Sequence, residues 1–292
     1  MQIYGSRRFK LKKKLNRSIS GNIFFFLMIV LLGAFTALPL VLAISNAFKP
    51  LDEIFLFPPR LFVRNPTMEN FSDLILLMQN AWVPFLRHVA NSLVITAAGT
   101  ALNIIVASLC AYPLAKMKLP FSNLIFGLII LTLMFSREIT TIPNYLLMSR
   151  LGIINTQWAV ILPAIGGSIG LFLMKQFIEA NVPDSLLEAA KIDGAGEIRI
   201  LFRIVMPIVK PAWLTMIIFN VQALWNDSGA LLLYNEELKP LPYALSQILL
   251  GGLQRTGTMA AATLIIMLVP ITIFIVTQSH IIETMGSSGI KE

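Results

Sequence analysis

The stretch EAAKIDGAGEIRILFRIVMP, residues 188–207, is among the most polar in a chain that is otherwise strongly apolar. Ser185 and Glu188 fit the Ser-x-x-Glu capping box that begins many helices, and Pro183 discourages an earlier start. We therefore expect a helix of about two and a half turns that continues through Asp193.

Two further features predict a sharp turn and a second helix. Gly194 is placed for the left-handed residue just beyond a helix, where a side chain is penalised. The second helix is expected over 196–206, because Pro207 cannot continue the hydrogen-bond ladder. Ala189 and Ala190 keep one face of the first helix small, so another surface can approach closely. The segment is either a plain surface loop or a docking element, and two helices favour docking.

The composition is that of a membrane protein. Of the 292 residues, 56% are hydrophobic and only 13% are charged, whereas soluble domains carry roughly 25% charged residues. About 20 apolar residues suffice to cross a bilayer as a helix, which satisfies its own backbone groups. We therefore predict an all-α integral membrane protein with six transmembrane helices. They are expected at approximately 21–46, 88–114, 119–140, 155–177, 208–231 and 257–281.

The basic residues predict how these helices are oriented. With both termini inside, the cytoplasmic segments hold fifteen of the 23 lysines and arginines, and the outer segments hold eight over a greater length. Cytoplasmic loops are enriched in Lys and Arg, so an N-in, C-in arrangement is favoured. The expected parts are a basic cytoplasmic tail (1–20), a six-helix domain (21–281) with a cytoplasmic loop (178–207) and an outer loop (47–87), and a cytoplasmic C-terminal tail (282–292).

The outer loop contains one more helical pattern. Thr67 is expected to cap a short helix on which Phe71, Leu74 and Met78 recur at helical spacing. This apolar face predicts a helix that lies at the outer membrane interface.

Several chemistries lack the residues that they need. Cys110 is the single cysteine, and we expect no metal site and no catalytic residue. The glycine-rich loop that holds ATP phosphates does not occur, so ATP is expected to bind other subunits. A Gly-x-Ser-x-Gly pattern at 166–170 lies in an uncharged run, where with Pro163 it predicts a kinked span rather than a hydrolase. The basic residues that give the net charge of +8 are not interleaved with aromatics on one surface, which argues against binding of nucleic acid.

The opening stretch carries a resemblance to a known family. It reproduces the pattern EAA, three residues, Gly, nine residues, I-x-L-P, through Glu188, Ala189, Ala190, Gly194, Ile204, Met206 and Pro207. This pattern is similar to the cytoplasmic signature of permease subunits in binding-protein-dependent ABC importers. Met206 stands where that family has Leu, which is a volume-conserving exchange.

The resemblance covers nearly the whole chain and is closest to the sugar-importer branch, the MalG-like type. SNAFKPLDEIFLFPP (45–59), IPNYLLMSRLGIINTQWAVILP (142–163) and LPYALSQIL (241–249) look like motifs of that branch, the last of them in an outer loop that touches the binding protein. FSREI (135–139) and the tail GSSGIKE (286–292) depart from it.

The resemblance implies an ABC importer type I permease fold in a bacterial cytoplasmic membrane. It implies that the first helix is a coupling helix that binds an ATPase subunit. The implied coupling residues are Ser185, Glu188, Ala189, Ala190, Asp193 and Gly194. The implied partners are a second permease subunit, two ATP-binding subunits that hold ATP and Mg, an extracellular or periplasmic solute-binding protein, the lipid bilayer and a carbohydrate, expected to be an oligosaccharide. The chain itself is expected to bind no cofactor and to catalyse no reaction.

Polar groups at membrane depth usually face a cavity or one another. The candidates for a translocation path are Arg137, Glu138, Asn144, Trp225, Asn226 and Asp227. Trp225 could stack on the face of a sugar. The other interpretation is a satisfied polar pair, or a contact with the second permease.

Three other functions were weighed against a sugar importer. The permease of a non-sugar ABC importer would carry the same EAA segment. A secondary transporter would need inverted repeats and buried carboxylates that bind coupling ions, and no such repeat is visible. An intramembrane hydrolase would need the Gly-x-Ser-x-Gly pattern to follow a strand.

Overall fold

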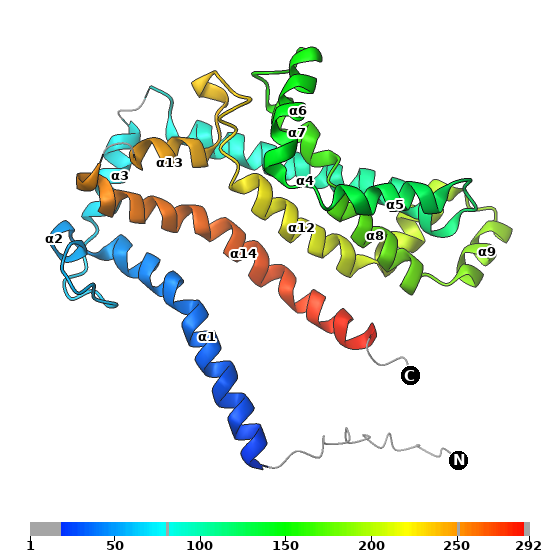
Figure 1. The fold of residues 1–292 in the computed structure, drawn as a ribbon, viewed down its shortest axis with the longest axis horizontal. Coiled ribbons are helices and arrows are strands. Elements are labelled where there is room, and N and C mark those ends of the chain that lie inside the picture. The colour runs from blue at the N-terminus through cyan, green and yellow to red at the C-terminus, as the bar shows by residue number, and fades with distance from the viewer. Residues whose placement is uncertain (1–18, 80–81, 250–251, 289–292) are drawn as a thin grey trace, which may run out of the picture.

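The computed structural model describes residues 19–79, 82–249 and 252–288 (Figure 1). These residues form helices and no strands, so the predicted all-α class is confirmed for them. Most of the predicted basic tail and the last residues of the C-terminal tail lie outside the described residues. The longer helices are α1 (Ile19–Phe48), α3 (Glu69–Gln79), α4 (Phe85–Lys116), α5 (Ser122–Thr132), α6 (Arg137–Arg150), α7 (Gln157–Ile165), α8 (Ser168–Asn181), α9 (Asp184–Ile192), α12 (Lys210–Trp225), α13 (Leu241–Leu249) and α14 (Thr256–Ser288). The short elements are α2 (Leu51–Ile54), α10 (Glu197–Ile200), a π-helical turn (Leu201–Val205), α11 (Met206–Ile208) and 3₁₀ turns at Glu236–Leu238 and Leu253–Arg255.

Four helical stretches among the described residues are long and apolar enough to cross a membrane. They are Ser20–Phe48, Phe85–Lys116, Gln157–Asn181 and Thr256–Gln278. Glu197–Ile208 and Lys210–Trp225 would make a fifth only as a single span bent by 81°. Because a helix rises about 1.5 Å per residue, α5 and α12 measure only about 16 and 24 Å, against roughly 30 Å of hydrocarbon.

Two of the six expected helices are shorter than predicted. The span expected over 119–140 is not one helix, since α5 ends at Thr132, the chain turns, and α6 begins at Arg137. Ser136 is extended at this break, where a polar run interrupts the apolar sequence. The helix expected over 208–231 begins at Lys210 and ends at Trp225, before the polar pair Asn226 and Asp227.

Helix α4 lies at the centre of the fold. It packs against α7, α8 and α12, whereas α14 packs against α1, α3, α12 and α13. Figure 1 shows α1 diverging from the other helices, and no residue in its most apolar window is buried.

The two ends of α4 meet different parts of the chain. Its C-terminal end contacts the segment that contains α9 and α10, through Tyr112 and Lys116. Its N-terminal end contacts the segment around Glu237 and Lys239, near α3 and α13. The segments expected inside and outside the membrane thus lie at opposite ends of one helix (Figure 1).

The helix expected in the outer loop is confirmed as α3. The Thr67 hydroxyl accepts a hydrogen bond from the backbone N–H of Glu69 at 3.1 Å, as a capping residue does. Leu74 is buried, and Phe71 and Met78 pack against the same apolar cluster.

The kink expected near the glycine pair is also confirmed. Helix α7 ends at Ile165 and α8 begins at Ser168, with Gly166 and Gly167 between them. The Ser168 hydroxyl accepts a hydrogen bond from the Thr132 hydroxyl at 2.7 Å. Ser168 thus begins a helix that follows another helix, whereas the hydrolase nucleophile follows a strand.

Candidate functional site

The turn after α9 has the geometry expected of Gly194. Its backbone φ is +78°, in the left-handed region. The N–H of Gly194 donates to the carbonyl of Lys191, and the N–H of Ala195 donates to the carbonyl of Ala190, both at 3.0 Å. These two bonds form a Schellman motif, which satisfies carbonyls that the helix end leaves free. The prediction of a left-handed glycine here is confirmed.

The predicted start of α9 is wrong. The helix begins at Asp184, Pro183 occupies the N-cap position, and no side chain caps the first turn. Ser185 therefore lies within the helix, and the capping box that it was expected to form with Glu188 is absent. Proline explains the earlier start, since its fixed φ suits a helix entry and it has no N–H to leave unsatisfied. The Asp184 carboxylate also lies where the helix dipole favours negative charge.

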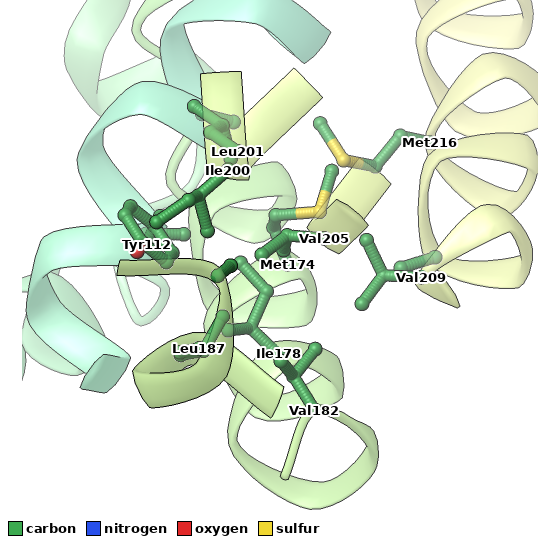
Figure 2. Close-up of a cluster of buried hydrophobic side chains, with 14 residues drawn as sticks. Tyr112, Met174, Ile178, Val182, Leu187, Ile200, Leu201, Val205, Val209 and Met216 are labelled. Atoms are coloured by element: carbon green, nitrogen blue, oxygen red, sulfur yellow. The ribbon is translucent and has the colours of Figure 1, made fainter. Parts of the chain in front are cut away.

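One face of α9 packs on the protein and the other is free in this chain. Leu187 and Ala190 are buried in a cluster with residues of α4, α8 and the π-helical turn (Figure 2). Most of the expected coupling residues are exposed, namely Ser185, Glu188, Ala189, Asp193 and Gly194. Ala190 is the exception, because it faces the core and cannot contact a partner directly.

An open hollow of about 590 Å³ adjoins the free face. Its lining combines the turn glycines with charged and apolar side chains of the following helix. These residues are Gly194, Gly196, Glu197, Ile198, Arg199, Phe202 and Arg203. Ile192, beside the hollow, is 86% exposed, and Ile198, in its lining, is 69% exposed. Exposed isoleucines next to basic groups suit a protein partner better than water.

The second helix does not end at Pro207 as predicted. It runs from Glu197 through a π-helical turn and α11 to Ile208, and the sharp bend follows at Val209. In the π turn the Met206 N–H reaches back to the carbonyl of Leu201, five residues earlier. This wider turn lies directly before the proline and relieves the clash that a proline ring causes in a regular α-helix.

Three of the residues expected along a translocation path, Trp225, Asn226 and Asp227, lie at the end of α12 and directly after it. Trp225 is 2% exposed and its indole N–H donates to the carbonyl of Ile266 at 2.9 Å, so no ring face is free to stack on a sugar. Asn226 is exposed, and its side-chain amide bonds the carbonyl of Gln222. The Asp227 carboxylate accepts the N–H of Gly229.

The remaining path candidates belong to α6. Glu138 is exposed and Asn144 is half-buried, one and a half turns further along the helix. Arg137 begins this helix, but its side chain lies outside the described part of the chain.

A buried amide centre connects the middle of the bundle. The side-chain N–H₂ of Asn103 donates to the carbonyls of Ala164 and Ile165, at 2.9 and 3.0 Å, at the end of α7. Its oxygen accepts from the Asn220 amide of α12 at 2.8 Å. Asn103 thus joins three helices at the kink. An asparagine in an apolar run was a visible signal that the sequence analysis did not use.

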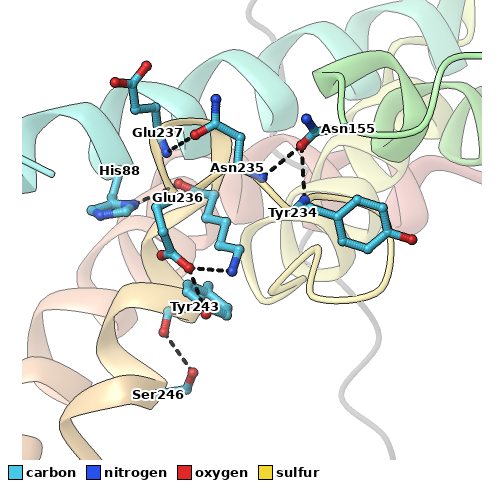
Figure 3. Close-up of polar contacts among 9 residues, drawn as sticks. His88, Asn155, Tyr234, Asn235, Glu236, Glu237, Tyr243 and Ser246 are labelled. Atoms are coloured by element: carbon cyan, nitrogen blue, oxygen red, sulfur yellow. Dashed lines mark hydrogen bonds and ion pairs between the residues drawn. The ribbon is translucent and has the colours of Figure 1, made fainter. Parts of the chain in front are cut away.

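The segment after α12 is held to α4 by a second polar group (Figure 3). The carbonyl of Lys239 lies 2.8 Å from the His88 ring nitrogen and accepts from the Asn91 amide at 3.1 Å. The Asn155 side-chain oxygen accepts the N–H groups of Tyr234 and Asn235. The path of this segment is therefore fixed by side chains from two other parts of the chain.

No group of His, Cys, Asp and Glu side chains in the described residues could hold a metal ion. What the fold defines is a membrane-embedded helical bundle with an exposed helix–turn–helix at one end, which is the architecture of a transport permease. The chain matches the family described as binding-protein-dependent transport system inner membrane component over residues 103–285, and it belongs to that family.

Individual relatives agree with this assignment. The protein LplC of Bacillus subtilis is 35% identical over 74% of this chain and 71% of its own length. The melibiose/raffinose/stachyose import permease protein MelC of Bacillus subtilis is 31% identical over 69% of this chain and 74% of its own. A bacterial ABC transporter involved in the import of the acidic polysaccharide alginate contains a chain with the same fold, at a TM-score of 0.76, 22% identity and coverage of 91% of this chain and 99% of that chain.

Proposed function

We propose that this chain is one of two permease subunits of an ATP-driven importer that carries a carbohydrate, as an oligosaccharide, into the cytoplasm. The observation that carries the proposal is α9, which exposes Glu188 and Ala189 of its EAA triplet and ends at a left-handed Gly194. The names of the relatives support a carbohydrate, since one imports melibiose, raffinose and stachyose and another, 29% identical, transports arabinooligosaccharides. The permease of a non-sugar importer is the alternative.

The proposed topology has six crossings with both termini inside. The crossings are α1, α4, α5, α7 with α8, α12 and α14, of which α5 and α12 are the short ones. Residues 178–207 are then cytoplasmic, 47–87 lie outside, and 1–20 and 282–292 are tails. The separation of these segments to opposite ends of α4 supports this arrangement, as does the excess of basic residues in the inner segments.

The proposed mechanism needs no chemistry in this chain. ATP and Mg bind two partner subunits, and closure of those subunits moves α9. This movement re-faces a central cavity between the two permeases. An external solute-binding protein delivers the oligosaccharide to the outer segments, including α13, and alternating access passes it inward. Glu188, Ala189 and Asp193 are proposed to contact the ATPase, whereas the buried Ala190 allows close packing beneath them.

A cysteine at Ala189 tests both docking and orientation. We expect Ala189→Cys to form a cross-link to the co-purified ATPase subunit and to resist an impermeant thiol reagent added outside intact cells. Glu237→Cys, at the other end of α4, should react with that reagent.

The transported solute is tested separately by uptake. Cells should take up raffinose or arabinotriose, and a dipeptide should not compete with this uptake.

Each of these three expectations has an outcome that would contradict it. Labelling of position 189 from outside would reverse the topology, and absence of a cross-link would leave α9 as a connecting loop. Competition by the dipeptide would favour the non-sugar importer.

A second prediction concerns the path. Glu138 and Asn226 are exposed in this chain and lie in or beside apolar segments, where polar side chains usually face a cavity or a polar partner. If they line the path, Glu138→Gln or Asn226→Ala should lower raffinose or arabinotriose uptake by about tenfold, as loss of one hydrogen bond to substrate does. Subunit assembly and basal ATP hydrolysis should be retained. Uptake at the unaltered rate in both variants would show that these side chains serve only structural contacts.

A further inference from the structure

Helix α9 is attached to α4 at both of its ends. At its first residue, the Asp184 carboxylate pairs with the Lys116 ammonium at 2.8 Å. In its last turn, the Lys191 ammonium pairs with the Glu197 carboxylate at 2.7 Å. The other oxygen of Glu197 accepts the hydroxyl hydrogen bond of Tyr112, also at 2.7 Å. Two attachment points fix the direction of α9 as well as its position.

Both attachments come from one face of α4. Tyr112 and Lys116 are four residues apart in its last turns, so their side chains project in the same direction. The Tyr112 ring is 3% exposed and belongs to the cluster that contains Leu187 of α9 and Ile200 of α10 (Figure 2). The apolar cluster holds α4, α9 and α10 together, and the polar contacts of Tyr112 and Lys116 set their register.

Glu197 is the side chain that all three elements share. It begins α10, and its two carboxylate oxygens bind Lys191 of α9 and Tyr112 of α4 separately. The hydrogen bond from Lys191, and then that from Tyr112, hold the pKa of the Glu197 carboxyl below its ordinary value. The carboxylate is therefore ionised at neutral pH and can serve both partners at once.

We propose that Glu197 is a positioning residue that joins the coupling helix to α4, so that a displacement of α9 is passed to α4 through the hydroxyl of Tyr112. This inference rests on the proposed function, in which a partner moves α9. The same helix binds the α7–α8 kink through Asn103 and the segment after α12 through Asn91. A shift of α4 consequently reaches both the middle of the bundle and its far end.

The bridge is separable from folding and from docking. Tyr112→Phe removes one hydroxyl and keeps the buried ring in the apolar cluster. The Tyr112 side chain is buried, so it cannot contact an ATPase subunit itself. Glu197→Gln keeps an oxygen that can accept from Tyr112 and loses the charge that attracts Lys191. Glu179→Gln is the matched control, because Glu179 pairs with Lys175 within α8 and, among the described residues, with no side chain of another helix.

The native Cys110 offers a reporter on α4, two residues before Tyr112, and it is exposed in this chain. In the complex purified with its partner subunits, the rate of Cys110 alkylation by N-ethylmaleimide would be followed by mass spectrometry, with and without ATP, Mg and vanadate. Coupled sites typically differ by about fivefold or more between states, so we expect a change of about that size. This ATP-dependent change in the alkylation rate should shrink to less than about half of its size in Tyr112→Phe and Glu197→Gln. It should keep its size in Glu179→Gln. The double variant should resemble Glu197→Gln, because both changes break one connection.

The cross-link from Ala189→Cys, added in parallel samples, separates the possible failures. With the cross-link intact, an unaltered Cys110 response in Tyr112→Phe, or no response in the unsubstituted complex, would overturn this inference and leave the proposed function standing. Loss of the cross-link in Tyr112→Phe would assign the bridge to docking and would also overturn it. Absence of the cross-link in the otherwise unsubstituted complex would overturn the proposed function itself.

Discussion

Replacing Gly194 by valine is expected to reduce the Ala189→Cys cross-link to the ATPase by about tenfold and to stop solute uptake, without impairing membrane insertion. The backbone at Gly194 has φ of +78°, and left-handed backbone costs a residue with a side chain roughly 1–2 kcal/mol. To avoid this strain, the chain would give up the hydrogen bonds from Gly194 and Ala195 that end α9. The direction of α9 relative to the hollow beside it would then change.

Gly196→Val is the matched control for this prediction. A side chain at either glycine would meet nothing within 4 Å in this chain, but Gly196 has φ of −71° and ψ of 155°, which valine adopts readily. The two variants therefore add the same side chain two residues apart and differ in backbone strain. Undiminished cross-linking in both variants would show that the left-handed turn does not set the docking geometry.

Local features of this segment could be predicted from sequence, but the start of α9 and the end of the second helix were both misjudged. A glycine after a polar helix predicts a left-handed end, because few other residues tolerate that conformation. The start of α9 was ambiguous, since Pro183 and Ser185 are both common near helix entries, and the proline occupies the N-cap. The helix end predicted at Pro207 was wrong because a π-helical turn before the proline lets the helix continue.

Contacts between distant residues could not be predicted in the same way. Tyr112 and Glu197 are 85 positions apart, and nothing in their local sequence states that they meet. The burial of Trp225 also depends on α14, whose Ile266 carbonyl accepts its indole N–H. Apolar runs gave the approximate helices, but hydropathy alone did not reveal that the run over 119–140 breaks after Thr132. Pairing across the bundle is a property of packing, which a single sequence does not display.

The buried amide centre at Asn103 gives the second large effect, because its space depends on a glycine. A side chain at Gly170 of α8 would begin 2.8 Å from the Asn103 side-chain oxygen and 2.7 Å from the terminal methyl of Met216. Met216 can rotate away, since its side chain is flexible. Asn103 cannot move without weakening its bonds to Asn220 and to the end of α7.

Gly170→Val is therefore expected to destabilise the assembled permease by about 2–5 kcal/mol. Overpacking costs roughly 1–3 kcal/mol, and a broken hydrogen bond between membrane helices adds up to about 1–2 kcal/mol. The measurement is the fraction of the complex that remains monodisperse in detergent after heating. Gly127→Val is the control, since a side chain on this glycine of α5 would meet nothing within 4 Å in this chain. Similar heat resistance in the two variants would mean that the three helices can separate at the kink without loss. A second variant, Asn103→Leu, should leave the carbonyls of Ala164 and Ile165 without their donor. We therefore expect it to lower heat resistance as Gly170→Val does. Unchanged heat resistance in Asn103→Leu would contradict this role of the amide.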